Sequence, residues 1–113
     1  MITNPQKLIE KLEKLPDEIY EQEKKTLEAK EALEMKKIEL DVKQADAMLK
    51  AQKPNASEKK AQALIDTQET RKEVLKSSLE YERQNAYLTA LNNQFTALRK
   101  VSSIETELLK ANL

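Results

Sequence analysis

The chain has 113 residues, the size of one domain, and its 20 basic residues balance 20 acidic ones. It contains no Cys, His, Trp or Gly, which excludes disulfide frameworks, zinc sites, thiol or imidazole catalysis and glycine-rich phosphate-binding loops. More than half of the residues are Ala, Glu, Lys, Leu or Arg, a composition typical of long helices and coiled coils. We therefore expect an all-α protein with a single domain over residues 1–113.

The first predicted element is a short helix over residues 5–15. Four apolar residues here recur at spacings of four and three, as on one face of a helix: Leu8, Leu12, Leu15 and Ile19. Pro16 interrupts this stripe. It either ends the short helix or only kinks one continuous helix, and both interpretations stay open at this point.

A long helix is predicted over residues 17–52, because nothing within that range breaks a helix. One row has the spacing of a coiled-coil seam and consists of Met35, Ile38, Val42, Ala45 and Leu49, with Tyr20 and Leu27 on the same side. A second row repeats every seven residues nearly opposite and consists of Leu33, Leu40 and Ala47. One partner helix cannot cover both rows.

Residues 53–57 are the predicted turn, because Pro54 disfavours a helical conformation at Lys53. Asn55 and Ser57 are both suitable caps for the helix that follows. That helix is predicted to run without a break over residues 58–111.

This last helix is also apolar on two sides. One side carries Tyr81, Leu88, Leu91, Phe95 and Leu98. The other side carries Leu75, Leu79, Ala86, Ala90, Ala97, Val101, Ile104 and Leu108. The apolar surface is therefore wider than one antiparallel neighbour needs.

A tight turn near residue 54 predicts a long antiparallel two-helix hairpin, a coiled coil in which the numbers of facing residues add up to about 109. Leu8, Leu12 and Leu15 then lie opposite the segment from Phe95 to Val101. We expect the best packing in the zone formed by Leu88, Leu91, Phe95 and Leu98 with Leu8 and Leu12. The uncovered rows indicate a dimeric helical bundle. The hairpin can also open, so that the long helices pair between chains, and this alternative stays open.

The two-sided apolar pattern predicts a non-catalytic interaction module, acting as an adaptor, inhibitor or assembly factor through a helix face. The expected partner is another protein, a second copy of the chain, or both. The residues predicted to form the partner or self-association face are Leu33, Leu40, Tyr81, Tyr87, Leu88, Leu91 and Phe95.

An accessory nucleic-acid-binding role in replication or recombination is the alternative. Basic residues are interleaved with acidic ones along the whole chain, whereas nucleic-acid-binding proteins concentrate them on one face. Residues that could contact nucleic acid in this alternative are Arg83, Arg99 and Lys100.

No constellation of side chains indicates catalysis, and we expect no metal, cofactor or small-molecule substrate. Glu28, Glu31 and Glu34 follow one another at three-residue spacing, but exposed helix charges with nearby Lys partners account for them. No run of apolar residues is long enough to span a membrane, so we expect no membrane partner and a cytoplasmic location.

Two stretches carry a resemblance to known proteins. One runs from Asn55 to Ala63, and the other, from Tyr81 to Lys100, includes Tyr87-Leu88, Phe95 and Ala97-Leu98-Arg99-Lys100. Together they cover about a quarter of the chain. They resemble segments of small helical coiled-coil accessory proteins encoded by phages and prophages of Gram-positive bacteria, often near replication and recombination genes. The resemblance implies a non-enzymatic accessory protein in the host cytoplasm.

Overall fold

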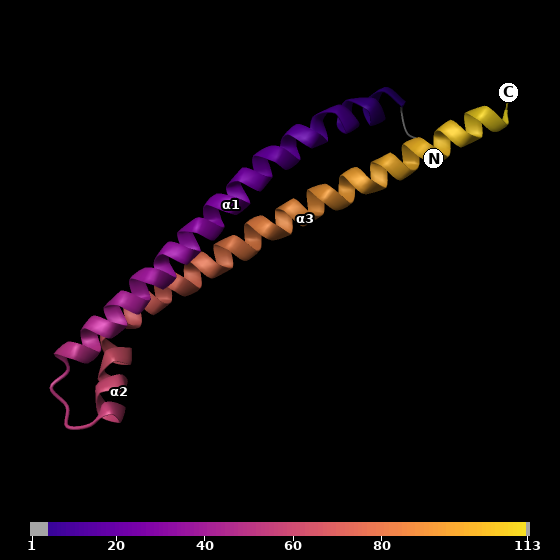
Figure 1. The fold of residues 1–113 in the computed structure, drawn as a ribbon. Helices are drawn as coiled ribbons and strands as arrows, with labels where there is room; N and C mark the ends of the chain where they lie inside the picture. Colours follow the sequence, from indigo (N-terminus) through magenta and orange to yellow (C-terminus); the bar gives the residue numbers. More distant parts are fainter. Residues whose placement is uncertain (1–4, 113) are drawn as a thin grey trace. The chain divides into compact units, whose positions relative to one another are not determined.

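The computed structural model describes residues 5–112, and it contains three helices and no strand in that range. Helix α1 covers Pro5–Lys50, α2 covers Ala56–Asp66 and α3 covers Gln68–Ala111 (Figure 1). The prediction of an all-α protein is therefore confirmed.

Helix α1 continues through Pro16, so the structure differs from the predicted separate helix over residues 5–15. Proline has no N–H group and cannot bond to the carbonyl of Leu12, one turn earlier. The side chains on both sides of Pro16 support the continuous helix, because Leu15 is buried and Ile19 is half-buried. Burying a Leu side chain contributes about 1.5–3 kcal/mol, which offsets much of the cost of an interior proline, about 3 kcal/mol.

The predicted turn lies between α1 and α2, and Asn55 caps the start of α2. Its extended backbone (φ −139°, ψ 164°) places the side-chain Oδ1 2.8 Å from the backbone N–H of Glu58, which donates a hydrogen bond to it. This bond satisfies one of the backbone N–H groups that the first turn of a helix leaves without a partner.

The helix predicted over residues 58–111 is in two pieces, because Thr67 separates α2 from α3. The Thr67 hydroxyl donates to the carbonyl of Ala63 at 2.7 Å, a back-bond that is often associated with bent helices. The Arg71 guanidinium donates to the carbonyl of Leu64, which in an unbroken helix would accept the N–H of Gln68. Side-chain hydrogen bonds thus support a break that the sequence does not mark with Gly or Pro.

The contacts divide the chain into two compact units, each formed by segments distant in sequence. In unit 1, described residues 5–26 of α1 meet residues 84–112 of the chain's last helix and its end. Its buried side chains, all on α1, are Leu8, Leu15, Gln22 and Thr26. Half-buried side chains complete the packing from α3 and are Leu88, Leu91, Phe95 and Leu98.

Unit 2 comprises residues 27–83, which include the end of α1, all of α2 and the start of α3. Its buried side chains are Leu33, Ala63, Thr67 and Thr70. Lys36 forms an ion pair with Glu73 at 2.9 Å, and the Lys43 ammonium donates to the Thr70 hydroxyl at 3.3 Å. Residue numbers rise along α1 while those of the contacted α3 residues fall, so the two segments are antiparallel within this unit.

Candidate interaction surfaces

The clearest candidate surface is an apolar row on the α1 segment of unit 2. Five large apolar side chains of this row are 57–87% exposed. We call them the α1 outer row, and they are Leu27, Met35, Ile38, Val42 and Leu49. Successive residues on a helix are about 100° apart, which places this row nearly opposite the buried Leu33. Glu31 interrupts the row between Leu27 and Met35, and from Met35 to Leu49 the exposed apolar stripe is of the kind that is typical of an interaction site.

Acidic side chains line one edge of the α1 outer row, namely Glu28, Glu39 and Asp46. The Lys36 and Lys43 ammonium groups lie 3.1 and 3.0 Å from carboxylate oxygens of Glu39. Hydrogen bonds from Lys43 and Lys36 lower the pKa of Glu39, and the bond from Lys50 to Asp46 raises the pKa of Lys50. These exposed ion pairs add little stability each, but they hold the edge of the row in a charged, hydrated state.

The structure places the predicted face residues Leu33 and Leu40 on the inner side of α1. Leu33 is 5% exposed and Leu40 is half-buried, so neither presents an open surface in this chain. The alternating spacing of four and three residues that begins at Leu8 continues along α1 to Leu33 and Leu40. It passes through polar positions such as Gln22 and Lys36. This continued spacing is the feature of the sequence that identifies the inner side of α1. It is hard to recognise because the row on the opposite side is more apolar.

The α3 residues of the predicted face fall into two groups. Four of them are half-buried on the side of α3 that packs in its own unit, and they are Tyr81, Leu88, Leu91 and Phe95. Tyr87 differs, because its side chain is 54% exposed. Of the predicted α3 face, only Tyr87 is thus fully available to a partner.

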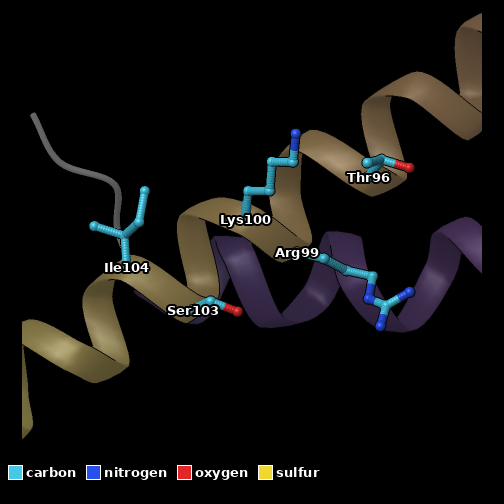
Figure 2. A pocket seen from close by; sticks show the side chains of 5 residues that line it. All are labelled: Thr96, Arg99, Lys100, Ser103 and Ile104. Carbon is cyan, nitrogen blue, oxygen red and sulfur yellow. The ribbon is translucent and has the colours of Figure 1, made fainter.

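The three basic residues of the nucleic-acid alternative make separate contacts. Arg83 is paired with Glu80 at 2.9 Å, and the Arg99 guanidinium lies over the Phe95 ring, 5.7 Å from its centroid. Lys100 and Arg99 line a shallow hollow of about 430 Å³ together with Thr96, Ser103 and Ile104. Figure 2 shows that the Arg99 and Lys100 side chains extend from α3 in different directions.

A polar junction lies within the packing of unit 1. The Gln22 amide donates to the side-chain oxygen of Gln84 at 2.7 Å and to its backbone carbonyl at 3.0 Å. The Thr26 hydroxyl lies 2.9 Å from the carbonyl of Gln22 and 3.2 Å from that of Gln84. A buried polar pair of this kind fixes the alignment of two helices, because any shift leaves its polar atoms without partners.

A second outward row lies on α3, with Leu75 and Leu79 in unit 2 and Ile104 and Leu108 in unit 1, and these four side chains are 51–60% exposed. Between them lie exposed small residues, of which Ala86, Ala90 and Ala97 point in the same direction by helical periodicity. We call these residues the α3 outer row. Val101, predicted for the same side of this helix, is half-buried.

Within residues 5–112, no helix is long and apolar enough to cross a bilayer, and no group of acidic side chains is placed to hold a metal ion. No protein-family model matches the chain, and no curated protein or solved structure is significantly similar to it.

Proposed function

We propose that this protein is a non-catalytic interaction module that binds a helix of another protein through the α1 outer row. The observation that carries the proposal is the exposure of five large apolar side chains along one side of α1, from Leu27 at 57% to Leu49 at 87%. A partner that covers these side chains removes apolar surface from water, and this stabilises the complex by about 25 cal/mol per Å² of buried apolar surface. An adaptor, inhibitor or assembly factor would work in this way.

The apolar and charged side chains of the α1 outer row indicate which kind of partner segment it binds. An amphipathic helix matches a straight apolar stripe, because its own apolar residues recur at the same spacing. Basic residues beside its apolar face would meet Glu28 and would compete with Lys43 and Lys50 for the carboxylates of Glu39 and Asp46. Such charges affect the rate and specificity of association more than the affinity.

The proposal includes the hairpin and a homodimer. The hairpin is supported by contacts inside each unit. Lys36 and Glu73 pair at 2.9 Å, and their residue numbers add up to 109, the sum predicted for facing residues of the hairpin. Gln22 and Gln84, joined at 2.7 Å, come within three of that value. The homodimer is supported by the second apolar row on α3, and the phage resemblance supports a site of action in the host cytoplasm.

The test is capture of partners by the tagged protein from extract of its own host, with and without nuclease, using matched variants. Ile38→Glu with Val42→Glu places two charges in the α1 outer row. Ala32→Glu places a charge at an exposed position elsewhere on the same part of α1 and is the control. We expect the double variant to lose a near-stoichiometric protein partner more than about tenfold, as loss of interface anchors does, while Ala32→Glu retains it.

A partner retained equally by both variants would overturn the assignment of this row. A partner lost after nuclease treatment of the wild-type sample would overturn the interaction module in favour of nucleic-acid binding. Circular dichroism of each variant shows that its helices are intact.

A further inference from the structure

One segment of α3 lacks charge in a chain in which 35% of the residues are charged. From Gln84 to Leu98, fifteen consecutive residues include no Asp, Glu, Lys or Arg. The outward positions of this segment carry small or amide side chains, among them Ala86, Ala90, Asn93 and Ala97, and all four are exposed. Depletion of charge is the compositional signal of the centre of a protein interface, and small residues let two helices approach closely.

The order of large and small side chains along the α3 outer row is symmetric about the middle of the row. When α3 is paired with an antiparallel copy of itself so that facing residue numbers add up to 183, large apolar side chains of the row face large apolar ones, and its small side chains face small or amide ones. The facing pairs are Leu75 with Leu108, Leu79 with Ile104, Ala86 with Ala97, and Ala90 with Asn93. Large side chains therefore pack at both ends of the row and small ones at its centre.

The charges beside the row agree with the same alignment. Glu82 lies on one edge, and Lys100 of a second copy comes next to it on the same edge, at a position sum of 182. On the other edge, Lys76 comes next to Glu105 of the second copy, at a sum of 181. Two-fold symmetry repeats both pairs, and among the described residues none of these four has an ion-pair partner within its own chain. Opposite charges along an interface fix its register.

The α1 outer row does not have this property. Pairing it with an antiparallel copy so that Ile38 meets itself places Glu28 beside Asp46 of the second copy. Glu39 and Asp46 already have lysine partners in their own chain, so this edge of the row offers a second copy no unpaired charges of opposite sign. The two outer rows therefore differ in the partner they suit.

From these relations we infer that the α3 outer row is the homodimer interface: two chains associate through an antiparallel α3–α3 contact, with its two-fold axis between Ala90 and Asn93. The inference deepens the self-association in the proposed function and rests on it. The α1 outer row then stays open on both chains, so that one dimer presents two copies of the surface for a different protein.

Disulfide trapping tests both the face and its register, and the absence of native Cys makes the readout clean. The double variant Ala86→Cys with Ala97→Cys brings the two thiols together across the two-fold axis, within the distance at which a disulfide closes. In the matched single variants, the equivalent Cys residues of the two chains are separated by eleven residues along the helix axis, about 16 Å. We expect the double variant to give a covalent dimer on a non-reducing gel and each single variant to remain a monomer there.

Three other results would overturn the inference. Covalent dimers in both single variants would mean a parallel alignment. The absence of a covalent dimer in the double variant, when the unmodified chain is a dimer by light scattering, would mean that another face forms the dimer. A monomeric unmodified chain would remove self-association altogether, and the α1 outer row would then be judged separately, by the capture experiment with Ile38→Glu and Val42→Glu.

Discussion

The side-chain amide of Gln22 donates a hydrogen bond of 2.7 Å to the side-chain oxygen of Gln84, and this bond joins α1 to α3 in unit 1. Gln22 is 9% exposed and Gln84 is half-buried, so the bond is partly shielded from water. The Gln22 amide also reaches the Gln84 backbone carbonyl at 3.0 Å. A polar contact inside an apolar seam contributes little net stability. In any other alignment, however, its polar atoms would be buried without partners, which destabilises that alignment.

Gln22→Ala should lower the free energy of unfolding by about 1–2 kcal/mol, because it leaves Gln84 acceptors with poorer partners and removes packed side-chain atoms. The measurement is urea denaturation followed by circular dichroism. Asn85→Ala, at an exposed position of α3, is the control and should change stability by less than about 0.5 kcal/mol. Equal stability of Gln22→Ala and the unmodified chain would contradict a structural role for this pair.

Pro16→Ala should stabilise the protein, because the new N–H can bond to the carbonyl of Leu12 inside a continuous α1. An interior proline costs about 3 kcal/mol, which is an upper limit for the gain. Pro54→Ala is the matched control, since Pro54 lies between α1 and α2 and its replacement loosens the unfolded chain instead. A destabilised Pro16→Ala variant would mean that the proline is needed for the course of α1.

Asn55→Ala should cost about 1 kcal/mol of stability, because it removes the oxygen that accepts the Glu58 N–H at 2.8 Å. Asn55→Asp should retain most of the stability that the cap contributes, since a carboxylate also caps a helix. Asn92→Ala, at an exposed position inside α3, should be neutral or slightly stabilising because Ala favours helix. The denaturation midpoints of the three variants rank these effects, and equal losses at residues 55 and 92 would contradict the cap.

The pH dependence should report the ion pairs of Lys36. Its hydrogen bonds to Glu73 and Glu39 raise the pKa of Lys36 above its ordinary value of 10.5. A raised folded-state pKa means that this stabilisation is complete below pH 10.5 and is lost as the pH rises through the folded value. The pKa of Glu39 is lowered from 4.5 by bonds from Lys43 and Lys36, so its contribution is present above that pH and is lost as the pH falls through the lower folded value.

The comparison of the unmodified chain with Lys36→Gln isolates these pairs. The difference in unfolding free energy should be constant near neutral pH and should shrink at both extremes. It should also fall with added salt, because these side chains are 38–52% exposed and salt screens partly exposed charges. A difference that does not change with pH or salt would show that Lys36 acts through packing alone.

The amount of the fold that the sequence predicts depends on the kind of signal. The spacing of Leu8, Leu12 and Leu15 and the turn at Pro54 identify helical segments and their ends, because these patterns act locally. The inner side of α1 was harder to identify. The row with Met35 and Ile38 is the more apolar one, yet the structure buries the row with Leu33, since the choice depends on which face meets α3.

The break at Thr67 could not be predicted for a related reason. Neither Gly nor Pro marks it, and each residue nearby is compatible with a helix. The break depends on tertiary packing that buries Ala63, Thr67 and Thr70 and on the bond from Arg71 to Leu64. The predicted single domain and the nucleic-acid alternative stay predictions.

The most direct test of the idea that the outer rows serve association is the mass of the unmodified protein in solution, measured by light scattering at increasing concentration. Self-association through α3 predicts a mass that approaches twice the 13.0 kDa of the chain and does not rise further, because an antiparallel two-fold contact closes on itself. A mass that stays at 13.0 kDa up to the highest concentration that remains in solution would contradict the homodimer.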